Sequence, residues 1–285
     1  MKKSKNIVIT GVSTGIGYTT VQALIKRGYR VFGSVRKQVD ADRLKKEFGD
    51  LFEPLLFDVT DMEAVKSEAA RVEQLIGSEG IHSLINNAGI AVWGPMMHVP
   101  LEDLRWQLEV NVVGLVGITQ AFLPLLGAKE NCSHAAGRVF NISSAAGEIA
   151  NAFMGPYSAS KHALEAISKT MRMEFMLYGI DVVVIGPGVV KTPIWDKAEE
   201  VDLNKFAGTG YEKSGAKFKK FMMKISKEGY EQAEFGEMMA NIIEAKKPKA
   251  RYPLVYGKFK NWTVPRLMPT RKLASIIGKV LGFTK

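Results

Sequence analysis

The chain contains little cysteine and histidine and no long uncharged apolar run. Its 285 residues include one cysteine, Cys132, which excludes an intrachain disulfide; the polar segment 127–137 around it predicts a surface loop. The four histidines show no metal-ligand spacing, so no metal site is expected. The chain has no stretch of about 18 uncharged apolar residues, so no spanning helix is expected, and the apolar run 6–11 is too short for a signal peptide. These absences favour a cytoplasmic location.

Acidic residues are missing from the C-terminal segment. None occurs after Glu244, whereas residues 246–285 contain eleven lysines and arginines, which account for the net charge of +10. We therefore define a basic C-terminal extension at about 246–285. Nucleic-acid binding is not expected, because no recognition motif accompanies the charge. Apolar residues at 273, 276, 277, 280 and 281 have helical spacing, and two placements fit them: peripheral contact with an anionic membrane, or packing against the domain or a second subunit.

Short apolar runs alternate with helical patterns along most of the chain. The predicted strands are 6–10, 30–34, 53–57, 83–86, 137–142 and 180–185, and the predicted helices are 16–27, 40–48, 62–76, 101–126 and 157–178. Nearly continuous apolar strands are typical of a parallel sheet covered on both faces. The alternation predicts an α/β fold, a doubly wound sheet of about seven strands in one domain, 1–285, with its core at 5–193. Residues 193–235 break the rhythm and are predicted to form a substrate lid.

Three glycines follow the first strand where a helix begins. Gly11, Gly15 and Gly17 allow positive φ angles and close approach of a ligand to the backbone. The N-terminus of the following helix offers free N–H groups to a pyrophosphate. The predicted dinucleotide loop comprises Gly11, Ser13, Thr14, Gly15, Ile16 and Gly17.

The second strand ends in Val35 and is followed by Arg36 and Lys37. A carboxylate at this place would bind the ribose 2′-hydroxyl of NAD(H), whereas a guanidinium suits the 2′-phosphate of NADP(H). NADP(H) is therefore preferred over NAD(H), with Arg36 as a cofactor residue. The alternative is that Arg36 is only a solvated loop charge.

Tyr157 and Lys161 lie four residues apart on a predicted helix. This spacing brings a phenol and an ammonium onto one face, roughly 5–6 Å apart at Cβ. A neighbouring cation lowers the pKa of a tyrosine, which suits general acid–base chemistry. By itself, the pair is also typical of a solvated helix face.

These glycines, with the Tyr–Lys pair about 140 positions later, resemble the classical short-chain dehydrogenase/reductase family over residues 5–193. The resemblance implies a Rossmann-like domain and the catalytic tetrad Asn111, Ser144, Tyr157 and Lys161, in which the spacing of thirteen to the tyrosine selects Ser144 over Ser143. Gly186 stands where many relatives carry Asn. The cofactor contacts that the family resemblance implies are Asp58, Val59, Asn87, Ala88, Gly89, Tyr157, Lys161, Pro187, Gly188, Val190 and Thr192.

The resemblance also implies roles for the tetrad in hydride transfer between a nicotinamide and a carbon bearing oxygen. Ser144 would bind the carbonyl, Tyr157 would donate the proton, and Lys161 would lower the tyrosine pKa and hold the nicotinamide ribose. Asn111 would keep a water in place, or as a buried amide would satisfy backbone groups. For Asp58, the alternative to a cofactor contact is an Asx turn.

Bulky apolar residues cluster near the expected substrate entrance. They are Val92, Trp93, Met96, Met97, Phe153, Met154, Ile194, Trp195, Phe206, Phe218, Phe221 and Met222. Together with a looser resemblance to the 17β-hydroxysteroid and retinol dehydrogenase branch, they predict a lipophilic steroid-, retinoid- or long-chain-like alcohol or carbonyl. The alternatives are an NADPH-binding regulator without turnover and a reductase of a small polar carbonyl. The family likeness suggests a homodimer or homotetramer through helices 101–126 and 157–178.

Overall fold

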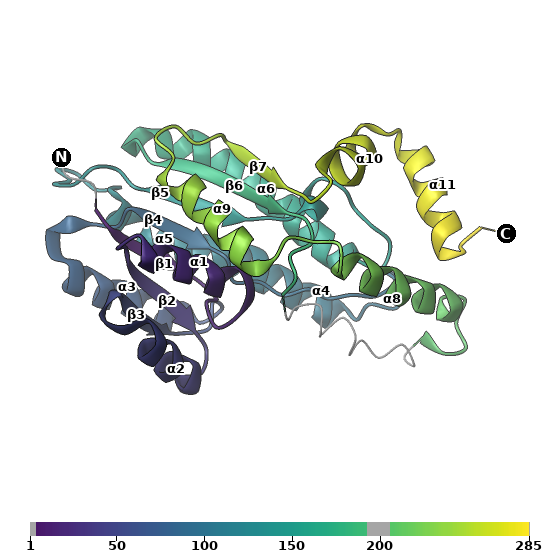
Figure 1. The fold of residues 1–285 in the computed structure, drawn as a ribbon, viewed down its shortest axis with the longest axis horizontal. Coiled ribbons are helices and arrows are strands. Elements are labelled where there is room, and N and C mark those ends of the chain that lie inside the picture. The colour runs from purple at the N-terminus through teal and green to yellow at the C-terminus, as the bar shows by residue number, and fades with distance from the viewer. Residues whose placement is uncertain (1–3, 193–205, 285) are drawn as a thin grey trace.

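A seven-stranded parallel sheet lies between two layers of helices in the computed structural model, which describes residues 4–192 and 206–284 (Figure 1). The strands are β1 (Asn6–Ile9), β2 (Arg30–Val35), β3 (Phe52–Leu56), β4 (Ser83–Asn86), β5 (Arg138–Ile142), β6 (Asp181–Pro187) and β7 (Arg251–Leu254). Their order is β3-β2-β1-β4-β5-β6-β7. The predicted doubly wound α/β class is confirmed.

Helices cover both faces because the strands are apolar on both sides. One face packs against α1 (Gly15–Lys26), α2 (Gln38–Phe48) and α9 (Gln232–Glu244). The other packs against α3 (Met62–Ile76), α5 (Gly114–Phe122) and α6 (Gly155–Glu174). Helix α4 (Leu101–Leu108) continues into α5 through the π-helical turn η3 (Glu109–Val113). The 3-10 turn η4 (Leu123–Leu126) extends α5, and the 3-10 turn η6 (Phe175–Tyr178) extends α6.

The order of the strands places a switch point between β1 and β4. The connections leave these two neighbours in opposite directions, which opens a crevice at the carboxyl ends of the strands, where doubly wound sheets bind ligands. The loops that carry the predicted site residues follow β1, β2, β3, β4, β5 and β6 at this edge.

The seventh strand lies within the basic extension, where no strand was predicted. β7 pairs with β6 at the sheet edge, with Gly186 opposite Pro253. Proline is tolerated on an edge strand, where one side needs no ladder hydrogen bond. The extension is therefore built into the sheet before it continues as η8 (Phe259–Thr263), α10 (Val264–Leu267) and α11 (Thr270–Leu281).

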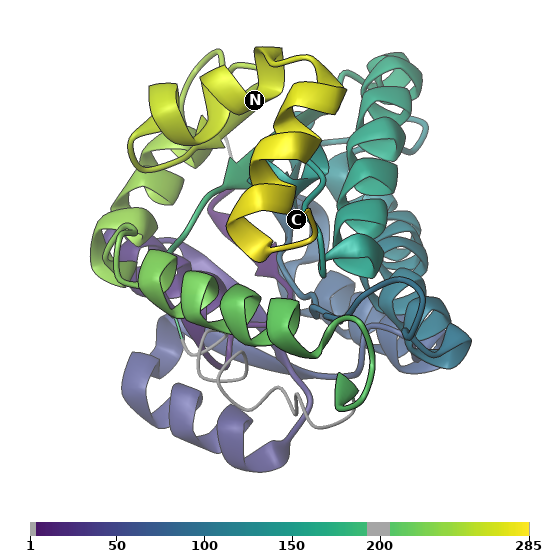
Figure 2. The ribbon, with the colours of Figure 1, turned by 90° about the vertical axis from the view of Figure 1, so that its right-hand side faces the viewer.

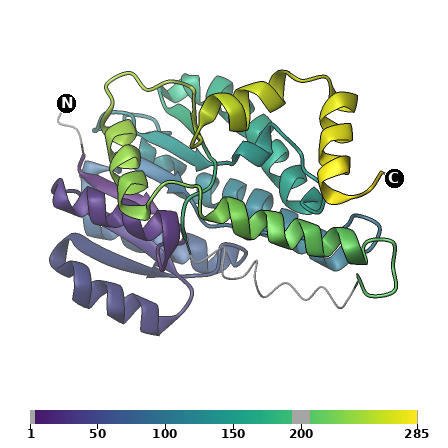
Figure 3. The ribbon, with the colours of Figure 1, turned by 45° about the vertical axis from the view of Figure 1, so that its right-hand side comes forward.

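Helices α10 and α11 share one end of the molecule with α8 (Glu212–Ser226), opposite the N-terminus (Figures 1 and 3). Seen from that end, α11 lies above α8 (Figure 2), and the two helices contact each other. Of the predicted lid 193–235, residues 193–205 lie outside the described residues, and the part that follows contains α8.

One helical stretch, Leu101–Leu126, is long and apolar enough to cross a membrane by length and composition, with a hydropathy of 1.5 in its most apolar window. No spanning helix was expected, because no stretch of about 18 uncharged apolar residues occurs; this stretch reaches the level because mean hydropathy tolerates a charge such as Glu109. Within the described residues, 44% of that window is buried. Leu115, Ile118 and Phe122 pack in the core beside α3, which explains the apolar composition.

Candidate active site

A cavity of about 870 Å³ runs along the carboxyl edge of the sheet. Of the predicted catalytic residues it contains Ser144, Tyr157 and Lys161. The predicted cofactor residues on its wall are Gly11, Ser13, Thr14, Gly15, Ile16, Arg36, Asp58, Val59, Asn87, Ala88, Gly89, Pro187, Gly188, Val190 and Thr192. The structure thus gathers into one cavity residues that are spread over about 180 positions of the sequence.

The glycine loop forms one end of the cavity. Gly11 and Gly15 have φ angles of 69° and 63°, a region that favours glycine. A Cβ on Gly11 would lie 2.9 Å from the Ala88 Cα, so the loop packs closely on the segment after β4. Within the described residues, the Thr14 side chain does not cap α1, which leaves the first N–H groups of that helix directed at the cavity. These residues fit the pyrophosphate of a dinucleotide.

Gly17 does not line the cavity, although the motif predicted contact with a cofactor. A Cβ there would lie 2.3 Å from the Gly11 carbonyl oxygen and 2.6 Å from the Asn87 amide nitrogen. The Asn87 amide in turn donates to the carbonyls of Thr10 and Gly11, each at 2.9 Å. Gly17 therefore permits the close packing that shapes the loop, and Asn87 holds the loop as well as lining the cavity.

Arg36 and Asp58 lie together where the second and third strands end. The Arg36 guanidinium is 3.8 Å from the Asp58 carboxylate and is well exposed. Asp58 also accepts hydrogen bonds from the Thr60 backbone and hydroxyl, which is the Asx turn considered as its alternative. Both residues line the cavity, so the turn and a cofactor contact are compatible.

Tyr157 and Ser144 meet in the middle of the cavity. Burial raises the pKa of Tyr157, and the hydrogen bond from Ser144 opposes this rise. Part of the tyrosine side chain nevertheless faces the cavity. The prediction that Lys161 lowers this pKa is not met in the structure, because the lysine nitrogen lies 5.8 Å from the tyrosine ring and donates instead to the Ile142 carbonyl at 2.8 Å. Tyr157 is therefore protonated at neutral pH and can act as a proton donor.

Lys161 is itself strongly perturbed. Burial lowers its pKa to about 8, and the negative charge of Glu165, one turn further along α6, acts in the opposite direction. The His162 ring bonds to the Ser158 carbonyl, whereas the Glu165 carboxylate accepts from Arg251.

We expect Glu165→Gln to move the alkaline limb of activity to lower pH, because the Lys161 ammonium loses the carboxylate that stabilises it. The measurement is kcat/KM for the dinucleotide against pH, which reports groups of the free enzyme. In the unchanged protein this limb should fall near pH 8, where Lys161 loses its proton. Glu174→Gln, on the exposed end of the same helix, should leave the limb in place; equal profiles for both variants would refute the coupling.

Asn111 lies behind the cavity wall and does not line it. It is buried within η3, where its amide accepts from the Ile90 N–H at 2.9 Å and donates to the Ile90 carbonyl at 3.0 Å and to the Ser160 hydroxyl at 3.1 Å. The contacts with Ile90 are the backbone contacts given as the alternative role of Asn111, and the water that it would hold stays a prediction. We describe Asn111 as a positioning residue that fixes the segment after Gly89.

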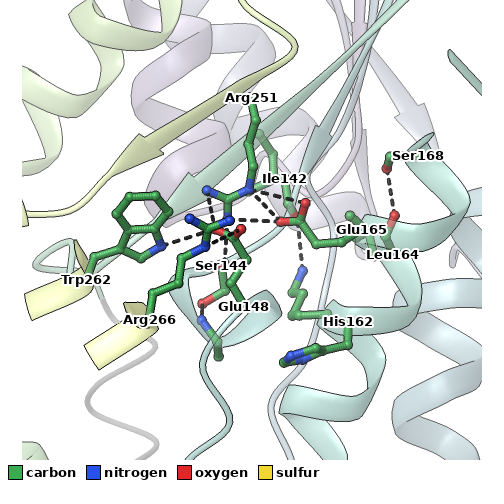
Figure 4. A network of polar contacts seen from close by, with 12 residues as sticks. Ile142, Ser144, Glu148, His162, Leu164, Glu165, Ser168, Arg251, Trp262 and Arg266 are labelled. Atoms are coloured by element: carbon green, nitrogen blue, oxygen red, sulfur yellow. Dashed lines mark hydrogen bonds and ion pairs between the residues drawn. The ribbon is translucent and has the colours of Figure 1, made fainter. Parts of the chain in front are cut away.

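Arg251 connects the catalytic loop and helix with the C-terminal extension (Figure 4). Its guanidinium contacts Glu165 at 3.0 Å, Glu148 at 2.8 Å and the Ser144 carbonyl at 3.3 Å. Glu148 also accepts from the Trp262 indole at 3.1 Å and from Arg266 at 3.1 Å. This network was not identified from the sequence.

Gly186 leaves the space that this guanidinium occupies. A Cβ at position 186 would lie 2.5 Å from an Arg251 nitrogen. The departure from the Asn found in many relatives therefore has a local physical reason.

The other end of the cavity is apolar. Among the residues predicted near the substrate entrance, Trp93, Met154, Phe218, Phe221 and Met222 line it. Phe153 and Phe206 are buried behind the wall, Met96 and Met97 are exposed, Val92 does not reach it, and Ile194 and Trp195 lie outside the described residues. The opposite wall comes from α11, through Leu273, Ile276, Ile277, Val280 and Leu281.

Comparisons with known proteins agree with this geometry. A family model described as short chain dehydrogenase matches residues 5–202. The NADPH-dependent 3-dehydrocapnine reductase of Ornithobacterium rhinotracheale is 41% identical over 274 residues, 96% of this chain and 96% of that protein. Dehydrogenase/reductase SDR family member 9 of Homo sapiens is 35% identical over 199 residues, 70% of this chain and 60% of that protein. A short-chain dehydrogenase from Streptomyces avermitilis has a TM-score of 0.78 at 26% identity and covers 100% of both chains.

Proposed function

The chain belongs to the short-chain dehydrogenase family and is an NAD(P)-dependent oxidoreductase that acts on the CH–OH/C=O pair, and we propose that it uses NADPH to reduce a ketone on a lipophilic molecule. One observation carries the proposal. A single cavity joins a glycine loop, a hydroxyl pair formed by Tyr157 and Ser144, and an apolar wall built from α8 and α11.

The tyrosine and the serine supply the acid side of this chemistry. The Ser144 hydroxyl stabilises the negative charge that develops on the carbonyl oxygen, and Tyr157 delivers a proton to it. Because burial raises the pKa of Tyr157, its hydroxyl holds the proton at neutral pH and can serve as the general acid that reduction requires. A nicotinamide dinucleotide supplies the hydride when it is bound. Lys161 carries a positive charge beside this pair below about pH 8.

Arg36 supports the choice of NADPH. It lines the cavity at the end of β2, where the next residue is also basic. The 41% identical relative is named as NADPH-dependent, which agrees with this choice.

We expect Arg36→Ser to lower the ratio of kcat/KM for NADPH to that for NADH by roughly 10- to 100-fold. A hydrogen bond to a charged group contributes about 1.5–3 kcal/mol, and only the phosphorylated dinucleotide loses it. The matched control is Lys37→Ser, the neighbouring basic residue, which does not line the cavity. An unchanged ratio in Arg36→Ser would contradict the assignment of this residue.

The apolar wall supports a lipophilic substrate. Phe218 and Met222 of α8 form a buried cluster with Phe153 and Leu281, so the wall has a fixed shape. The name of the relative supplies one specific ketone, and we propose 3-dehydrocapnine as the first compound to assay.

The test is NADPH oxidation with 3-dehydrocapnine and with a series of ketones of increasing chain length. We expect kcat/KM to rise with length, since each buried methylene contributes about 0.8 kcal/mol, or roughly fourfold. The same series with Phe218→Ser should rise less steeply. Preference for small polar carbonyls would reject the lipophilic substrate, and NADPH binding without turnover of any ketone would favour a regulatory protein.

A further inference from the structure

Helix α11 presents two different apolar faces. Ile277 and Leu281 join the cluster that includes Phe218 and Met222 of α8, and these contacts hold α11 over the cavity. Ile276 and Val280 remain 44% and 54% exposed, one turn apart on the adjacent side of the helix. Packing within the chain therefore uses only part of the apolar surface predicted for this segment.

The exposed apolar side is bordered by positive charge. Lys272 lies four residues before Ile276 and Lys279 three residues after it, and both lysines are exposed. The preceding residues add Leu267, which is 73% exposed, and Arg271. We call the exposed residues Leu267, Arg271, Lys272, Ile276, Lys279 and Val280 the docking face.

We propose that the docking face binds the surface of an anionic lipid bilayer. An amphipathic helix with a basic border inserts its apolar residues at the acyl boundary while its lysines contact anionic headgroups. Helix α11, which carries most of this face, lies beside α8 at the end of the molecule opposite the N-terminus (Figures 1 and 3).

Charge argues against a second copy of the chain as the occupant. A two-fold interface would place this basic surface against itself, and the chain supplies no acidic residue after Glu244 to neutralise it. An anionic membrane offers the complementary sign over an extended area.

The docking face also adjoins the cavity. Ile276 and Val280 belong to both, because they line the cavity and remain exposed. A molecule dissolved in the bilayer would reach the apolar wall without crossing water. This consequence rests on the proposed lipophilic substrate, whereas docking itself does not.

The experiment is flotation of the full-length protein with vesicles of phosphatidylcholine, either alone or mixed with phosphatidylglycerol. We expect the protein to float with the mixed vesicles and much less with the neutral ones. Lys272→Glu/Lys279→Glu should weaken partitioning by roughly 25-fold or more, since each basic residue near an anionic surface contributes about fivefold. Leu267→Ser should weaken it by roughly tenfold or more, because a buried leucine is lost from the lipid boundary.

The matched control is Lys246→Glu/Lys247→Glu, which makes the same charge change at the amino ends of the strands, where Arg138 at the start of β5 donates to the Lys246 carbonyl. It should float like the unchanged protein, and NADPH binding by all variants confirms that they are folded. Equal flotation of the two double variants, or equal binding to neutral and anionic vesicles, would overturn the proposal. Absence of flotation, combined with self-association that Leu267→Ser abolishes, would also overturn the proposal and would indicate a second copy of the chain as the occupant. NADPH oxidation in vesicle-free buffer tests the proposed function separately.

Discussion

Tyr157→Phe is expected to reduce kcat by about 10²–10⁴-fold, the range that a positioned proton donor contributes, while the Kd for NADPH changes little. The substitution removes the hydroxyl that Ser144 contacts and leaves the ring that packs beside Lys161. The loss should appear in single-turnover reduction at saturating NADPH, and cofactor binding should be followed by fluorescence titration. Because transition-state stabilisation is lost and ground-state binding is kept, kcat and kcat/KM should fall together.

Tyr178→Phe provides the matched control for this experiment. Tyr178 is 43% exposed at the end of η6, so the same loss of a hydroxyl should leave kcat unchanged. A Tyr157→Phe variant that keeps more than about a tenth of the rate would require a different proton donor. Ser144 would then be the next candidate, because its hydroxyl is the group hydrogen-bonded to that tyrosine.

Most of the sheet follows from local sequence signals, and its last strand does not. The first six strands were each predicted within one or two residues of their bounds, because most of them are apolar runs buried on both faces; β3, at the sheet edge, is only partly buried. β7 consists of Arg251, Tyr252, Pro253 and Leu254, a composition that disfavours a strand. It becomes a strand because β6 offers an unpaired edge, which is a property of the assembled sheet.

Sequence motifs identified which residues gather at the cavity but not how each one acts. Gly17 and Asn111 belong to the motifs, yet they support the cavity from behind, through Gly11 and Ile90. Spacing placed Lys161 beside Tyr157, but it could not show that burial perturbs both groups more than they perturb each other. Desolvation depends on the whole fold, whereas spacing depends on one helix.

The Arg251 network shows the limit of prediction from sequence most clearly. Glu165 and Arg251 are 86 residues apart, and the pair forms only after β7 joins the sheet. The Glu165 side chain is 7% exposed and the Arg251 side chain 18%, so neither charge is well solvated. Glu165 therefore depends on the Arg251 guanidinium for compensation, whereas Glu148 also contacts Arg266.

Arg251→Met is expected to lower the free energy of unfolding by about 3–5 kcal/mol, because it leaves a buried carboxylate, Glu165, without its partner. The measurement is urea denaturation at neutral pH. Arg251→Met combined with Glu165→Leu should recover much of the loss, since replacement of both partners removes the uncompensated charge. Lys66→Met, which breaks an exposed ion pair with Glu63 on α3, should cost no more than about 0.5 kcal/mol. If Arg251→Met cost no more than this control, the guanidinium would not stabilise the loop of Ser144 and the helix of Lys161, and the catalytic residues would owe their positions to core packing alone.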